Sequence, residues 1–327
     1  MRRAHGEDRQ IRHKICLVSA AGGHLTQILR VRPFIREADA YLVTVGIPSV
    51  RGQDFGCPVY FVERILRNPI CFLVNFLQSL WIFIREKPDI VISTGSGDAV
   101  PTFILASCLG RKTIYLESFA RVRKLSATGR IVWRFADTLL VQWRTLLDTC
   151  PQADFVGPVF AQGPTEAPSS PLKILVTVGT QAKGFDNLIR TVDDFFGSQP
   201  EQVEILAQIG TSKYEPRHLR WFRFLPQDQF AKLLQWADVV VTHSGAGLIG
   251  QALELGKRII VAPRVRSRGE SLWRGDAELP EALSNLGVVQ MARVEQVPAL
   301  ISRTANWVPN KLKEGRFREE IVRTLAK

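Results

Sequence analysis

Residues 237–256 read ADVVVTHSGAGLIGQALELG, and this stretch decides the class of fold. A short apolar run, 239–241, ends in a loop of small residues, and a helical pattern follows. Such a strand–loop–helix unit is the repeating element of α/β folds with parallel sheets. Inside the loop, Gly245, Gly247 and Gly250 match the Gly-x-Gly-x-x-Gly fingerprint of dinucleotide-binding domains. The stretch therefore predicts a diphosphate-binding loop, and it leaves open whether the ligand is NAD(P) or another diphosphate.

The same unit recurs along the chain. Apolar, strand-like runs alternate with helical patterns, and they span 14–19, 41–46, 59–63, 89–94, 112–117, 138–142, 173–178, 203–210, 221–226, 239–244 and 258–263. Continuous Val/Ile/Leu strands between helices are typical of parallel sheets covered on both faces. The pattern stops at 157–173, where four prolines indicate a linker.

We therefore expect an α/β protein with two Rossmann-like, parallel-sheet domains facing a cleft. The expected division is a basic tail over 1–13, a first domain over 14–160, a linker over 161–172 and a second domain over 173–327. A length of 327 residues is enough for two such domains, each with its own core.

The chain is strongly basic, with a formal net charge of +12. Such a balance favours an anionic partner, although solubility alone is the plainer interpretation. The charge is scattered and no nucleic-acid-binding module occurs, so we expect no nucleic acid as partner. Five widely spaced cysteines, without a C-x-x-C pair, fit a reducing cytosol and argue against a structural metal site. No apolar signal core follows the basic N-terminus, where a strand-like run begins at Lys14 instead, so we expect no secretory signal.

The longest uncharged run is PICFLVNFLQSLWIFI, residues 69–84. It is shorter than the roughly 20 residues that a membrane-spanning helix needs. Apolar residues at helical spacing, with others around them, leave two interpretations: a buried core helix, or a helix that dips into a bilayer surface with the help of Trp81.

Four predicted strands end in turns rich in glycine, serine or threonine that open helices: 19–24, 93–97, 177–180 and 242–247. Ligands of open α/β sheets bind beyond the carboxyl ends of the strands, and glycines let phosphates approach helix N-termini. NAD(P) fits poorly, because its fingerprint usually follows the first strand of a domain and an acidic residue ends the second. Here the strand after the loop ends near Arg264. An NADP-binding oxidoreductase remains an alternative.

Longer motifs occur in both halves. The first half carries SAAGGHLTQIL, EKPDIVISTGSGDAVP, YLESFARVRKLSATGR and ADTLLVQW; the second carries ILVTVGTQ-x-x-x-FDNLI, ADVVVTHSGAGLIGQALELGK and P-R-x-x-x-x-GE. From about Lys14 onward the chain resembles the two-subunit transferase that adds the second GlcNAc to the eukaryotic lipid-linked oligosaccharide, fused into one polypeptide. It looks most like the bacterial exopolysaccharide versions of that pair. It is distantly similar to the GlcNAc transferase that forms lipid II.

The resemblance implies an inverting GT-B glycosyltransferase of exopolysaccharide or capsule synthesis. The first domain would bind the acceptor, a saccharide on polyprenyl diphosphate, and the second a UDP-sugar that donates a hexose or hexuronic acid. It implies no cofactor and no metal, and no D-x-D sequence occurs. The enzyme would work from the cytoplasm, peripherally on the anionic inner face of the membrane. A catalytically weakened homologue that binds nucleotide sugar or lipid as a partner subunit is a second alternative.

The matched motifs then suggest acceptor-side roles. His24 would be the general base for the acceptor hydroxyl, or else a histidine that only shapes the loop. Glu117 is a second candidate base or an anchor for its loop. The acceptor diphosphate would approach a set of small loop residues: Gly22, Gly23, Gly95, Ser96 and Gly97. Arg121, with Arg123 and Lys124, would contact that diphosphate or membrane phosphates, or form a solvated face.

On the donor side, the UDP diphosphate would lie against Gly179, Thr180, Ser244, Gly245, Ala246 and Gly247. His243 would donate to a phosphate or pack at the end of its strand. Phe185 and Asp186 match a family motif and equally suit packing and capping at a helix start. Arg264 and Glu270 belong to the segment that follows the next strand.

The chain departs from the family at two points. Gln251 stands where the family usually has a ribose-binding glutamate, and the His-Gln pair expected near Gly275 and Asp276 is missing. Four arginines, Arg264, Arg266, Arg268 and Arg274, crowd this segment. Because guanidinium groups pair well with carboxylates, UDP-glucuronate is a candidate donor; further phosphate or lipid contacts are the plainer interpretation.

Overall fold

A computed structural model describes residues 13–30, 38–47, 50–65, 68–180, 183–197, 203–265, 269–270 and 276–325. Apart from His13, the predicted basic tail lies outside these residues. The chain divides into two compact units. Unit 1 comprises Met1–Ser118, Arg123–Val159 and Arg316–Lys327, and unit 2 comprises Phe119–Val122 and Phe160–Gly315.

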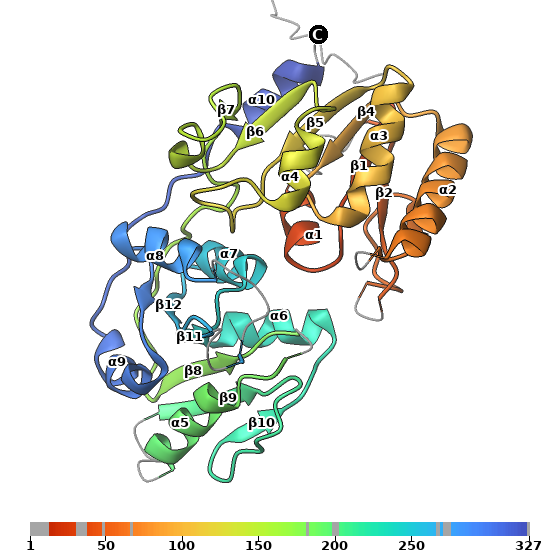
Figure 1. Ribbon diagram of the computed structural model, residues 1–327. Helices are drawn as coiled ribbons and strands as arrows, with labels where there is room; N and C mark the ends of the chain where they lie inside the picture. Colours follow the sequence, from red (N-terminus) through yellow and green to blue (C-terminus); the bar gives the residue numbers. More distant parts are fainter. Residues whose placement is uncertain are drawn as a thin grey trace, which may run out of the picture. The chain divides into compact units, whose positions relative to one another are not determined.

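Unit 1 is built on a seven-stranded sheet in the order β3-β2-β1-β4-β5-β6-β7 (Figure 1). Its strands are β1 (Ile15–Val18), β2 (Ala40–Val45), β3 (Val59–Val62), β4 (Ile90–Ser93), β5 (Lys112–Leu116), β6 (Thr138–Val141) and β7 (Asp154–Phe155). All neighbouring strands pair in parallel. The first six strands follow the order 3-2-1-4-5-6 of dinucleotide-binding domains, which confirms the Rossmann-like expectation.

The helices of unit 1 are α1 (Gly23–Ile28), α2 (Pro69–Glu86), α3 (Val100–Cys108), α4 (Ala127–Val132) and α10 (Phe317–Leu325). Alternate strand residues such as Cys16, Val18 and Val91 form one core cluster with buried residues of α2, α3 and α4. The alternation follows from the pleat, since successive side chains of a strand point to opposite faces. These three helices cover one face of the sheet (Figure 1).

Unit 2 repeats the topology with a six-stranded parallel sheet in the order β10-β9-β8-β11-β12-β13. The strands are β8 (Leu172–Thr177), β9 (Val203–Gln208), β10 (Arg220–Phe222), β11 (Val239–Thr242), β12 (Arg258–Val261) and β13 (Gln290–Met291). The helices are α5 (Asp186–Phe196), α6 (Gln227–Trp236), α7 (Ala246–Glu254), α8 (Glu278–Asn285) and α9 (Val297–Thr304). Strand order is again 3-2-1-4-5-6, so both units have the same switch point between their first and fourth strands.

Helix α10 ends the chain and packs with unit 1, although the sequence places it at the end of the second predicted domain. Its Phe317 and Ile321 are buried. Lys112 Nζ donates a 2.7 Å hydrogen bond to the Thr324 carbonyl, and Arg316 N donates to Val156 O at 2.5 Å. Burial of these apolar side chains stabilises the return of the chain from unit 2 to unit 1.

Helix α2 buries polar side chains and exposes apolar ones. Its buried face carries Asn75 and Ser79 besides Ile82 and Phe83, whereas its apolar stripe is exposed. The stripe consists of Ile70, Leu73, Val74, Leu77, Trp81 and Ile84. Helix α2 is therefore not a core helix buried on all sides. Within the described ranges, α2 is the one helix whose length and composition would allow it to cross a membrane, and most of it lies at the surface.

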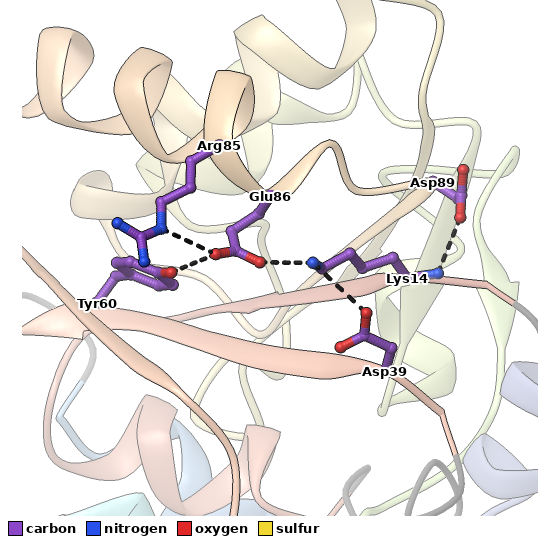
Figure 2. Close-up of polar contacts among 6 residues, drawn as sticks. All are labelled: Lys14, Asp39, Tyr60, Arg85, Glu86 and Asp89. Carbon is purple, nitrogen blue, oxygen red and sulfur yellow. Dashed lines mark hydrogen bonds and ion pairs between the residues drawn. The ribbon is translucent and has the colours of Figure 1, made fainter.

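The C-terminal end of α2 is held by a charged cluster at the amino ends of the strands (Figure 2). Lys14 Nζ lies 2.6 Å from Glu86 Oε2 and 3.4 Å from Asp39 Oδ2, and Tyr60 donates its hydroxyl hydrogen to Glu86. The hydrogen bond from Lys14 lowers the pKa of Glu86. Asp89 accepts from the Lys14 backbone N–H at 2.8 Å. The helix is thereby fixed to three strands while its apolar stripe points outward.

Candidate functional site

The predicted acceptor loops follow β1 and β4, which pair directly with each other. These strands lie at the switch point of the unit 1 sheet, where the connections run away in opposite directions and leave a crevice. Residues 19–24 follow β1 and residues 94–97 follow β4. Gly22 has φ +92°, a conformation that favours glycine.

His24 lies at the second position of α1 and is fixed by Thr94. Its Nδ1 lies 2.8 Å from the Thr94 carbonyl oxygen, and Thr94 Oγ1 donates to the His24 carbonyl at 2.8 Å. Because a carbonyl only accepts, Nδ1 carries the hydrogen, and Nε2 is the basic nitrogen of the neutral ring. This is the tautomer that a general base needs.

Gly95 lies next to the His24 ring. A Cβ at Gly95 would lie 3.1 Å from His24 Cε1 and 3.0 Å from the Tyr115 hydroxyl, and φ at Gly95 is +106°. The sequence predicted Gly95 only as a phosphate-side glycine. Its contacts add a second reason for glycine, because any side chain would displace the imidazole.

Ser96 and Gly97 complete the loop after β4. Ser96 has φ +83°, which is a strained conformation for a residue with a side chain. Its hydroxyl donates to Asp98 Oδ2 at 3.0 Å, and Asp98 Oδ1 accepts from Ile65 N at 2.9 Å. Asp98 is buried, so this pair of contacts holds the loop.

Glu117 is fully buried at the end of β5. Its Oε1 accepts from Ser118 N at 2.8 Å, and its Oε2 accepts from the backbone and hydroxyl of Ser126 at 2.9 and 3.1 Å. A Cβ at Gly129 would collide with the same carboxylate. Of the two roles considered for Glu117, this geometry suits the loop anchor. In the same loop Arg121 is partly exposed, and Arg123 and Lys124 are exposed.

The predicted donor loops follow β8 and β11, which pair at the switch point of unit 2. Gly179, with φ +72°, and Gly245 flank the buried ring of His243. A Cβ at Gly179 would lie 2.5 Å from the ring and one at Gly245 would lie 3.0 Å from it. Burial, followed by the charge of Arg264, lowers the pKa of His243 to about 3. His243 is therefore a neutral imidazole at physiological pH.

Helix α7 begins beside this ring. Its N-terminal residues are Ala246 and Gly247, with Gly245 at the N-cap and no side-chain cap among the described residues. Ser244 Oγ is buried without a hydrogen-bond partner in the described part of the chain. Thr180 is exposed, and Gln251 is partly buried on α7. Helix N-termini of this kind bind anions, because their N–H groups and dipole point at the ligand.

The third glycine of the fingerprint has a different partner. A Cβ at Gly250 would lie 2.6 Å from ring atoms of Phe160, which packs edge-on against Phe119. Gly250 therefore makes room for Phe160, the residue that precedes the predicted linker. The pattern that resembles a dinucleotide fingerprint thus combines loop glycines at Gly245 and Gly247 with a packing glycine.

Arg264 is buried and both Nη atoms of its guanidinium donate to backbone carbonyls, whereas Nε is buried without a hydrogen-bond partner in the described part of the chain. Nη2 donates to Val178 O at 2.8 Å and Nη1 to Lys183 O at 2.6 Å. Its charge also lies over the Phe185 ring, 5.3 Å from the centroid. Burial lowers the pKa of Arg264. Arg264 thereby organises the donor loops, and this role could not be recognised from the sequence.

Three further residues of the donor side have partners within unit 2. Glu270 Oε2 accepts from Val265 N at 2.8 Å. Phe185 is buried at the start of α5, and Asp186 Oδ1 accepts from Lys213 N at 2.8 Å. The remaining arginines of the segment, Arg266, Arg268 and Arg274, lie outside the described residues, as does Gly275.

Sequence reasoning missed Thr94, Tyr115 and Asp98 as parts of the acceptor-side arrangement. Thr94 precedes the Gly95-Ser96-Gly97 turn, so its position after a strand was a usable signal. Nothing in the sequence places Tyr115 and His24 on either side of Gly95, since 91 positions separate the two residues and the pairing of β1, β4 and β5 decides which loops meet.

Two family models match the chain in separate segments. Residues 62–159 match the model described as "Oligosaccharide biosynthesis protein Alg14 like". Residues 173–306 match the "Glycosyltransferase family 28 C-terminal domain". Apart from residues 119–122, the first match lies in unit 1, and the second lies in unit 2.

Individual relatives agree with these matches. UDP-N-acetylglucosamine transferase subunit alg14 of Schizosaccharomyces pombe is 30% identical over 165 residues, covering 42% of this chain and 79% of the relative. The UDP-N-acetylglucosamine–N-acetylmuramyl-(pentapeptide) pyrophosphoryl-undecaprenol N-acetylglucosamine transferase of Haemophilus influenzae (strain PittGG) is 22% identical, covering 92% and 90%. The crystal structure of Acinetobacter baumannii MurG superposes with a TM-score of 0.63 at 16% identity, covering 96% and 99%. This likeness shows the fold, which is GT-B.

Proposed function

The chain belongs to the Alg14-like family of oligosaccharide biosynthesis proteins, and from this premise we propose that it transfers a sugar from a UDP-sugar to a saccharide on polyprenyl diphosphate. One observation carries the proposal. A single polypeptide joins an Alg14-like segment to a glycosyltransferase family 28 C-terminal domain, so it combines an acceptor-type half and a donor-type half.

On the acceptor side, His24 is the general base. Thr94 holds Nδ1 through its carbonyl, so Nε2 takes the proton of the acceptor hydroxyl. The activated oxygen then attacks the anomeric carbon of the donor sugar, the bond to the UDP oxygen breaks, and the configuration inverts. Gly22, Gly23 and the loop from Gly95 to Gly97 leave room for the acceptor diphosphate.

On the donor side, the loops after β8 and β11 bind the leaving diphosphate. Backbone N–H groups at the start of α7 stabilise the charge that develops on UDP. The neutral ring of His243 contributes a hydrogen bond rather than a charge. Gln251, on the same helix, takes the ribose hydroxyls, and Arg264 keeps the surrounding loops in place.

N-acetylglucosamine is the first donor sugar to test, because the relatives' names specify it. We also propose a hexose or a hexuronic acid as alternative donor sugars. A role in exopolysaccharide or capsule synthesis is a proposal of the same kind. A carboxylate-binding role for Arg264 has less support, because both Nη atoms already donate to backbone carbonyls.

The enzyme works peripherally on the anionic inner face of the membrane, with the apolar stripe of α2 as its contact surface. Support comes from the stripe's exposure, from Arg85 stacked over Trp81 at 5.4 Å and from the net charge of +12. Apolar side chains enter the lipid while cations pair with lipid phosphates. Buried Asn75 and Ser79 keep the opposite face of α2 on unit 1.

A transfer assay with the purified full chain tests the proposal. The acceptor is a polyprenyl-diphosphate-linked monosaccharide, and the donors are UDP-GlcNAc, UDP-glucose, UDP-galactose and UDP-glucuronate, with His24→Gln as the inactive control. We expect release of UDP and a product with inverted anomeric configuration. The preferred donor identifies the sugar.

A thermal-shift panel with UDP, the four UDP-sugars and NADPH separates the alternatives. A ligand at 100 times its Kd stabilises by about 2.7 kcal/mol, which is a shift of several degrees. Binding of UDP compounds without any transfer would favour the weakened partner subunit. A shift with NADPH alone would favour an oxidoreductase and contradict the proposal.

A further inference from the structure

Two glutamine side chains are almost completely buried in unit 1. Gln27 on α1 and Gln142 after β6 each expose 1% of their surface. Burying an amide is unfavourable unless its groups find hydrogen-bond partners. Gln142 Nε2 donates to Gln27 Oε1 at 2.9 Å, so the two amides are joined directly.

The Gln27–Gln142 pair contacts residues next to the positions at which the chain passes from unit 1 to unit 2. Gln142 Oε1 accepts from Val159 N at 3.0 Å, and Val159 is the residue before the passage to unit 2. Gln142 Nε2 also donates to Glu117 O at 2.9 Å, and Gln27 Nε2 lies 3.5 Å from Ser118 Oγ. Ser118 is the residue before 119–122, which group with unit 2. The pair therefore contacts two of the crossing points.

The pair also contacts the first turn of α1, the helix that carries His24, the proposed general base. Gln27 Nε2 donates to the Gly23 carbonyl at 3.1 Å, and Gly23 directly precedes His24. The hydrogen bonds run in one sense, from Val159 N–H through both amides to Gly23 O. Only a side chain with both a good acceptor and a donor can serve at each position, because methionine has no donor and only a weak acceptor, and glutamate lacks the donor.

We propose that Gln27 and Gln142 are positioning residues for His24, linking the crossing points of the chain to the first turn of α1. This inference rests on the proposed function, in which His24 is the base. A displacement of the backbone at Val159 or Ser118 is transmitted through the two hydrogen-bonded amides to Gly23 and so to the His24 imidazole. Aligned hydrogen bonds of this kind act as a unit, so removal of either amide has most of the effect of removing both.

Kinetics test the proposal with Gln27→Met, Gln142→Met and the double variant. We expect kcat to fall by about tenfold or more because His24 is misplaced, while KM for the UDP-sugar stays unchanged. The double variant should match the single variants rather than multiply their losses. The control is Thr113→Val, which removes partly buried hydrogen bonds to Asp137 and Phe135 at the amino end of β5.

A second readout needs no activity. Nitrogen NMR of ¹⁵N-histidine-labelled chain, with His24 assigned through His24→Gln, reports the tautomer and titration of the ring. Because Thr94 still fixes the tautomer, Gln142→Met should shift the ring resonances and the titration of His24 without exchanging the tautomers, and Thr113→Val should change neither. Equal kinetics and an unchanged His24 signal in Gln142→Met would overturn the proposal. If wild-type chain lacks transferase activity, the proposed function fails while the NMR result still decides the coupling.

Hydrogen exchange covers the case in which Gln142→Met does not fold. The Val159 amide hydrogen should exchange slowly in the wild-type chain and faster in Gln27→Met, because that variant removes the acceptor that orients Gln142. The same protection in both proteins would contradict the coupling.

Discussion

His24 and Thr94 hold each other through two hydrogen bonds of 2.8 Å, one from the ring to the Thr94 carbonyl and one from the Thr94 hydroxyl to the His24 carbonyl. The ring tautomer and the position of the helix start are thus fixed by the same residue. A base in the first turn of a short helix needs such a support, since α1 has only six residues.

Replacing His24 by glutamine should reduce kcat by about 10²- to 10⁴-fold, because the acceptor hydroxyl loses its base. UDP binding, measured by thermal shift, should stay unchanged. Thr94→Val removes the hydroxyl bond but keeps the carbonyl, so a smaller loss of kcat is expected. A loss of UDP binding in His24→Gln would assign the histidine to the donor instead.

Gly95→Ala should destabilise the protein by about 1–3 kcal/mol, because the left-handed backbone and the contact with the His24 ring both oppose a side chain. Urea unfolding measures the change. Gly97→Ala is the matched control in the same loop, where a Cβ would meet nothing within 4 Å. Equal stability of the two variants would show that Gly95 is not confined by the imidazole.

Gly250→Ala should be destabilising only while Phe160 is present. A Cβ would lie 2.6 Å from the Phe160 ring, and overpacking of this kind costs about 1–3 kcal/mol. In a Phe160→Ala background the same change should be nearly neutral. Denaturant unfolding of the four proteins forms a double-mutant cycle, and additive effects would contradict the packing role of this glycine.

His243 should make stability depend on pH. Its pKa is lowered to about 3 in the folded chain, whereas an unfolded histidine titrates near 6.5. Between these values the unfolded state binds more protons, so this contribution is complete above about pH 6.5 and is lost as the pH falls toward 3. Midway between the two pKa values its slope is about 1.4 kcal/mol per pH unit.

Urea unfolding at pH 4.5, 5.5 and 7 compares wild type with His243→Phe and with His218→Gln. His218 is exposed in the same unit and serves as the control for loss of a histidine elsewhere. The phenylalanine variant should show a weaker dependence on pH. The same slope in all three proteins would rule out a neutral, buried His243 in the folded state.

Leu73→Ser with Leu77→Ser should weaken sedimentation with anionic vesicles, because both residues lie in the exposed stripe of α2. Binding of the wild type should fall with added salt and with zwitterionic lipid, since cations contribute. Val308→Ser is the control, as Val308 is highly exposed but lies in unit 2. Equal binding of both variants would exclude the stripe as the membrane contact.

The sequence by itself determined the two Rossmann-like sheets and the loops that follow β1, β4, β8 and β11. Alternating apolar runs and small-residue turns are local signals, and local conformation follows from them. The sequence also located His24, Glu117 and the glycines as candidates, since position at a strand end is readable from one segment.

Only the tertiary structure decided what these residues contact. Periodicity marked α2 as apolar, but which face is buried depends on Asn75 and Ser79 meeting Glu63, Asp98 and Thr102 from other elements. Gly250 serves Phe160, 90 positions earlier, and Thr94 serves His24, 70 positions away. Such pairings follow from strand register and chain return, because contacts between distant segments exist only once the sheets have formed.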